Sequence, residues 1–135
     1  MGFTFDELSS KVIAAAIEVH RRLGPGFLEG VYEQALRLEL AERGIPFEPQ
    51  KEIKVLYAGK PVGTHLLDLF VAGVLVVELK AVEGFEDIHF AQVKSYLRAS
   101  GAKVGLLMNF NCTRLSVKRV VLGFADSADH EKKDP

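Results

Sequence analysis

Three ionisable residues border or close a short apolar stretch of this sequence. Asp68 stands before it, and Glu78 and Lys80 close it. Side chains alternate along an extended strand, so Glu78 and Lys80 share one face at a spacing of about 6 to 7 Å. Two carboxylates suit a hard divalent cation such as Mg²⁺, which keeps several waters for chemistry. The pattern predicts a metal site in which Lys80 stabilises developing negative charge or helps to deprotonate an attacking water.

The loop between the two predicted strands decides whether the carboxylates meet. A three-residue loop at 72–74 places Asp68 opposite Glu78, with Cβ atoms about 5 Å apart. A two-residue loop places Asp68 opposite Val77, with its side chain on the other face. Facing carboxylates repel and raise each other's pKa unless a cation separates them. The competing interpretation is an ion pair of Lys80 with one of them that merely closes the sheet.

Hydrophobic spacing predicts two helices in the first third of the chain. Thr4 and Glu7 form a capping box, and apolar residues then recur every three or four positions over 5–23. A second periodic segment covers 28–40, and Gly44 stands where a helix ends. These helices precede the strands that would carry the ionisable residues.

The remaining elements alternate between strand and helix patterns. Period-two alternation between Lys51 and Lys80 predicts a three-stranded meander. A helix is expected over 86–100 and a strand over 103–110. Residues 114–122 favour a last strand because most of their apolar residues are β-branched, although a helix is the alternative. Helices covering a mixed sheet predict an α/β sandwich.

The composition indicates one compact globular domain. The chain has 135 residues, of which 48% are hydrophobic, and its formal net charge is -1. We expect a single domain over 1–124 and a polar tail over 125–135. The lone Cys112, the absence of a signal-peptide pattern and the shortness of the most apolar segment favour a cytoplasmic protein without a membrane partner.

Several short motifs carry a resemblance to a known family. Residues 26–32 read Gly-Phe-Leu-Glu-Gly-Val-Tyr, a GxxExxY pattern, and further matches stand at Glu78-Leu79-Lys80, Gln92-Val93-Lys94-Ser95-Tyr96-Leu97 and Gly105-Leu106-Leu107-Met108-Asn109. Over about residues 8–121 the chain resembles the GxxExxY proteins of the PD-(D/E)xK nuclease superfamily. The resemblance implies a restriction-endonuclease-like core of helix, three-stranded meander, helix and strand, with an extra N-terminal helix and a final strand. Here Pro61 does not adjoin Asp68, unlike the proline of the superfamily name.

The resemblance also implies a metal-dependent phosphodiesterase site. Asp68, Glu78 and Lys80 would form its centre, and Glu29 would be a further metal ligand, directly or through water. The implied cofactor is Mg²⁺, with Mn²⁺ as a substitute. The implied substrate is nucleic acid, with DNA favoured. The alternative for Glu29 is a solvated carboxylate that the helix dipole favours.

Two residues of the third predicted helix complete the implied site. Gln92 and Tyr96 are four positions apart and therefore share one helix face. The resemblance implies that they orient Lys80 or hold a phosphate. The alternatives are an exposed amide for Gln92 and a core-rim aromatic for Tyr96. His65 and His89 are expected at the surface without a role.

The near-neutral total conceals an uneven distribution of charge. Residues 1–87 carry a net charge of -5 and residues 126–135 one of -2, whereas residues 88–125 carry +6 without a single acidic residue. This basic segment begins in the helix with Gln92, so it could hold a phosphate backbone beside the metal site. A solvated basic face is the alternative. The six candidate phosphate contacts are Lys94, Arg98, Lys103, Arg114, Lys118 and Arg119.

Three functions are compatible with these patterns. The first is a Mg²⁺-dependent nuclease, acting alone, as a homodimer or with a protein partner. The second is a nucleic-acid-binding or protein-binding assembly module that keeps the fold without turnover. The third is a hydrolase or lyase of another phosphate compound.

Overall fold

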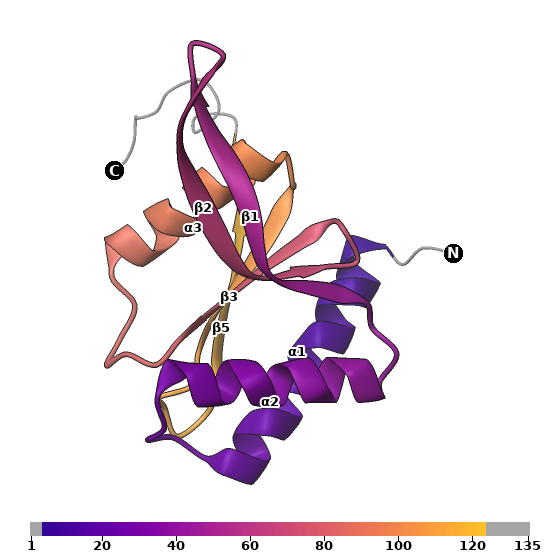
Figure 1. Cartoon of the computed structure of the whole chain (residues 1–135). Helices are drawn as coiled ribbons and strands as arrows, with labels where there is room; N and C mark the ends of the chain where they lie inside the picture. The colour runs from indigo at the N-terminus through magenta and orange to yellow at the C-terminus, as the bar shows by residue number, and fades with distance from the viewer. Residues whose placement is uncertain (1–3, 124–135) are drawn as a thin grey trace.

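A computed structural model describes residues 4–123 of the chain. Within this range the chain forms three helices and a five-stranded sheet (Figure 1). The elements in chain order are α1 (Phe5–Leu23), α2 (Glu29–Glu42), β1 (Phe47–Tyr57), β2 (Lys60–Val71), β3 (Leu75–Lys80), α3 (Asp87–Ser100), β4 (Val104–Asn109) and β5 (Ser116–Val121).

The sheet has its strands in sequence order, β1-β2-β3-β4-β5. Strands β1, β2 and β3 form an antiparallel meander, β3 and β4 are parallel and joined by α3, and β5 returns antiparallel to β4. Apolar side chains of α1 and α2 pack on one face of this sheet, and those of α3 pack on the other. The expected α/β sandwich with a restriction-endonuclease-like core is therefore confirmed.

Local signals in the sequence account for most element boundaries. The Thr4 and Glu7 side chains form both capping-box hydrogen bonds at the start of α1. The last element is a strand, which settles the alternative left open for 114–122. The meander begins at Phe47, four residues before its expected start. Residues 124–135, which include the expected tail, lie outside the described residues.

The β2-β3 hairpin has the three-residue loop. Leu69 pairs with Val77 and Val71 with Leu75, so the loop is residues 72–74. Ala72 and Gly73 both have positive φ angles, 53° and 71°. This register points Asp68 toward Glu78, although regular pairing ends one position earlier.

The outer part of the β1-β2 hairpin extends beyond the rest of the sheet (Figure 1). Residues 51–66 form this two-stranded projection, which we name the arm. Its tip exposes Leu56, Tyr57 and Val62. Because β3 pairs only with residues 69–71 of β2, no third strand of the described sheet lies beside the arm.

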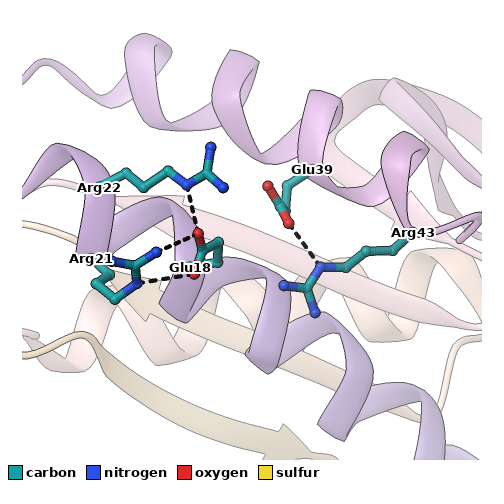
Figure 2. A network of polar contacts seen from close by, with 5 residues as sticks. All are labelled: Glu18, Arg21, Arg22, Glu39 and Arg43. Atoms are coloured by element: carbon teal, nitrogen blue, oxygen red, sulfur yellow. Dashed lines mark hydrogen bonds and ion pairs between the residues drawn. The ribbon is translucent and has the colours of Figure 1, made fainter.

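Two groups of charged side chains form ion pairs within α1 and at the C-terminal end of α2 (Figure 2). Glu18 accepts hydrogen bonds from Arg21 and Arg22, which lower its pKa to about 2, and Arg43 donates to Glu39. Such exposed pairs contribute little to stability. None of the described helices has an apolar stretch long enough to cross a membrane.

Gly105 allows α3 to approach β4 closely, which leads to a stability prediction. A Cβ at this position would lie 2.7 Å from Val93 Cγ1 and 3.6 Å from the Val76 carbonyl oxygen. We expect Gly105→Ala to lower the free energy of unfolding by about 1–3 kcal/mol through overpacking. Urea denaturation measures this loss. Gly63→Ala is the control, because a Cβ there meets open space, and an equal loss in both variants would contradict the packing argument.

Candidate active site

Asp68 lies where the sheet is irregular on both sides. Its carboxylate accepts a hydrogen bond from the Leu79 amide at 2.9 Å, so a side chain occupies a place that a main-chain carbonyl takes in a regular ladder. On the β1 side, Gln50 has a φ of 50° and interrupts the pairing between β1 and β2. The Asp68 side chain is thereby held inside the sheet, only 9% exposed.

Glu78 is buried next to Asp68 and is incompletely hydrogen-bonded. It is 4% exposed, and its Oε1 atom is buried without a hydrogen-bond partner among the described residues. Its Oε2 atom lies 3.6 Å from Lys80 Nζ. Burial, reinforced by the charge of Asp68, raises the pKa of Glu78 to about 8. Burial likewise raises the pKa of Asp68 to about 6, although the Leu79 amide opposes this shift.

Lys80 connects the carboxylates to α3. Its Nζ donates to Gln92 Oε1 at 2.9 Å, so Gln92 fixes the direction of the ammonium group. Tyr96, one turn further along α3, is 6% exposed. Burial, with the nearby charges of Glu78 and Asp68, raises the pKa of Tyr96 to about 12. Its phenol therefore stays protonated at neutral pH.

Glu29 begins α2, and the GxxExxY segment shapes the loop before it. The Tyr32 hydroxyl donates to the Gly24 carbonyl at 2.6 Å and accepts from the Phe27 amide at 3.1 Å. Gly26 has a φ of 110°, which an L side chain rarely adopts. Tyr32 is itself buried, so the motif ties the entry of α2 to the core.

The half-buried Glu29 is electrostatically coupled to the other site residues. Burial raises its pKa, Lys80 opposes the shift, and Glu33 adds to it. The negative charge of Glu29 also contributes to the raised pKa values of Asp68 and Glu78. The fold therefore brings Asp68, Glu78, Lys80 and Gln92 together and places Glu29 and Tyr96 within electrostatic range of the carboxylates.

The chemistry of these donors fits a divalent cation. The orphaned Glu78 Oε1 and the two raised carboxyl pKa values are features that a bound cation would relieve. Within residues 4–123, no three His, Cys, Asp or Glu side chains are grouped closely enough to hold a metal by themselves. Asp68 and Glu78 would thus be direct ligands, with water or main-chain oxygens completing the shell.

Glu33 and Gln50 lie near the site, although the sequence analysis did not assign them to it. Glu33 is buried, and Gln50 Nε2 donates to both of its carboxylate oxygens, at 3.0 and 3.2 Å. The charge of Glu33 helps to raise the pKa of Asp68. The four-residue spacing from Glu29 on one helix is the sequence signal that could have identified Glu33.

His65 was expected at the surface without a role, but it contacts two residues of α3. Its ring centroid lies 4.6 Å from that of Tyr96, and its Nε2 is 3.3 Å from Ser95 Oγ. His65 thus connects the arm to α3 beside the site. No spacing in the sequence indicated this contact.

The six basic candidates do not share one surface. Lys94 and Arg98 line one hollow on α3. Arg114 follows β4 at the end of the sheet where Lys80 lies, whereas Lys103 precedes β4 at the opposite end. On β5, Lys118 and Arg119 point to opposite faces, and Arg119 pairs with Asp6 of α1 at 2.9 Å.

Comparison with known families agrees with this architecture. The model of the PD-(D/E)XK nuclease superfamily matches residues 6–120. Because this match covers most of the chain, the chain belongs to the PD-(D/E)XK nuclease superfamily. Neither curated proteins nor solved structures give a match. Membership in the GxxExxY branch stays a prediction.

The raised carboxyl pKa values predict how the stability of the metal-free protein depends on pH. The folded state retains protons on Asp68 and Glu78 that the unfolded chain has released above its ordinary carboxyl pKa values of 3.8 and 4.5. The free energy of unfolding contributed by these groups is therefore present at low pH and is lost as pH rises through about 6 and 8. We expect the melting temperature in EDTA to fall by roughly 5 °C or more across this window.

Glu78→Gln should reduce this dependence, because the amide does not titrate. The exposed Glu52→Gln is the control and should retain the wild-type profile. Calorimetric scans in EDTA from pH 5 to 8.5 measure the difference. Parallel profiles for wild type and Glu78→Gln would show that the buried carboxyl does not titrate in this way.

Proposed function

We propose that this protein is a metal-dependent nuclease that hydrolyses phosphodiester bonds of nucleic acid, with DNA as the favoured substrate. The observation that carries the proposal is the buried Asp68 and Glu78 pair beside an ammonium that Gln92 holds in place. A sheet that needed only to be stable would not keep two adjacent carboxylates out of water.

The site residues have distinct roles in this proposal. Asp68 and Glu78 would hold Mg²⁺ or Mn²⁺, and Glu29 would act through a water, because it does not form a closely grouped ligand triad with them in the described structure. An ion bound there lowers the pKa of water and offsets the charge of the phosphate. Lys80 stabilises the negative charge that develops on the phosphate, since its ammonium is fixed by Gln92 at 2.9 Å.

Tyr96 and the basic residues would contact the substrate. A phenol that remains protonated can donate a hydrogen bond to a phosphate oxygen. Lys94 and Arg98 on α3 are the first candidates for further phosphate contacts. Arg114 is the next candidate, because it follows β4 at the end of the sheet where Lys80 lies. Lys103 lies at the opposite end of β4, and Arg119 is paired with Asp6 of α1.

The assembly and location of the protein are part of the same proposal. One site cuts one strand at a time, so cleavage of both strands of a duplex favours a homodimer or a protein partner. Cys112 is a free thiol, which agrees with the reducing cytoplasm that we expect.

A cleavage assay tests the proposal. Purified protein is incubated with Mg²⁺ or Mn²⁺ and plasmid, linear duplex, single-stranded DNA or RNA. We expect cleavage that EDTA abolishes and that Lys80→Ala or Glu78→Gln reduces by roughly 100-fold or more, because removing a preorganised electrostatic group has effects of this size. Gln92→Ala should lower kcat less, since Lys80 remains.

Lys11→Ala on α1 is the matched control, because it removes a lysine from the far face of the sheet. Melting temperatures confirm that each variant is folded. Equal cleavage by wild type and Lys80→Ala would indicate a contaminating nuclease and overturn the assignment. Binding of nucleic acid without cleavage under either metal would favour the non-catalytic module, and cleavage of small phosphodiesters alone would favour the third function.

A further inference from the structure

A cavity separates the arm from α3. Lys54, Val55 and Leu56 of β1 form one wall, and Arg98 and Ala99 of α3 form the other. Its volume of about 360 Å³ lies within the range of pockets that hold small ligands, about 300–1,000 Å³. The cavity is thus large enough for a single planar group and the groups attached to it.

This cavity adjoins the candidate active site along α3. Ser95 lines both the cavity and a second hollow that contains Lys80 and Gln92. His65 lines the cavity and packs its ring against Tyr96, with the two centroids 4.6 Å apart. A chain that entered the site at Lys80 could therefore continue along α3 into the cavity.

The charges of the lining favour an anion with an apolar body. Lys54 and Arg98 are the charged residues of this lining, and no carboxylate belongs to it. Both side chains are exposed, and neither forms an ion pair with another described residue. The rest of the wall is mainly aliphatic and includes the His65 ring. A nucleotide combines a flat base with a phosphate and matches this lining.

We propose that the cavity binds one unpaired nucleotide of the substrate, with its base against His65 and the aliphatic wall and its phosphate on Lys54 and Arg98. A base inside a duplex is stacked and paired, so it cannot enter a cavity between two protein elements without being extruded. The protein would then prefer single-stranded nucleic acid, or strand ends and flaps, to continuous duplex. This inference rests on the proposed nuclease function.

Equilibrium binding in EDTA tests the cavity separately from catalysis. Fluorescence anisotropy is measured with a labelled single-stranded oligothymidylate, an oligouridylate and a duplex of equal length. We expect wild type to bind one or both single strands at least tenfold more tightly than the duplex. The two single-stranded probes distinguish DNA from RNA as the source of the nucleotide.

Lys54→Ala and Arg98→Ala should each weaken single-strand binding several-fold and reduce the slope of log K against log salt by about 0.7, the value for one lost phosphate contact on a single strand. Ala99→Leu fills the cavity without changing the charge. It should weaken binding while leaving the salt slope unchanged. Lys11→Ala and Arg21→Ala on α1 are the matched controls, and both should bind like wild type.

The outcomes separate the cavity from the nuclease activity. Duplex binding as tight as single-strand binding, or wild-type affinity in both Lys54→Ala and Ala99→Leu, would overturn the cavity assignment even if the protein cleaves DNA. Single-strand binding that these variants weaken, without metal-dependent cleavage, would support the cavity and overturn the nuclease proposal alone. Loss of affinity in Lys11→Ala and Arg21→Ala to the same extent as in Lys54→Ala would indicate general attraction to charge and also contradict the cavity.

Discussion

The Asp68 carboxylate accepts the Leu79 amide at the point where β2 and β3 part, and the site depends on this hydrogen bond. It lets the sheet open without leaving the amide unsatisfied, and the opening leaves room for two carboxylates side by side. Burial raises the pKa of both carboxyl groups, and Lys80 offsets only part of their charge. Burying two neighbouring carboxylates costs free energy, and a bound cation would offset this cost by neutralising their charge.

The sequence could predict much of this arrangement because its determinants are local. Apolar spacing defines α1 and α3, and the loop at 72–74 sets the register that brings Asp68 toward Glu78. The Glu33 and Gln50 contact could not be predicted in the same way. It depends on a left-handed φ at Gln50, a non-glycine residue within a strand. Glu48, Pro49 and Gln50 also break the apolar alternation of β1, which explains why the strand begins earlier than the alternation predicts.

The basic segment shows why composition along the chain does not define a surface. Its basic residues lie on α3, on β5 and in the loops before and after β4, and side chains on a strand alternate between faces. Lys118 and Arg119 are neighbours in sequence but lie on opposite sides of the sheet, where Arg119 meets Asp6. Conversely, Lys54 and Arg98 are far apart in sequence and line the same cavity. Tertiary packing, rather than local charge density, decides which cations can act together.

Hydrogen bonds of the Asn109 side chain extend the ordered backbone beyond the end of β3. This side chain accepts from the Val82 amide at 3.0 Å and donates to the Val82 carbonyl at 2.9 Å, while the Phe110 amide donates to the Lys80 carbonyl at 2.9 Å. The hydrogen-bonded framework therefore continues two residues past the end of β3. Strand ends fray before their centres do. Lys80 is formally the last residue of its strand, yet it lies inside the framework and is protected from the fraying that affects a terminal position.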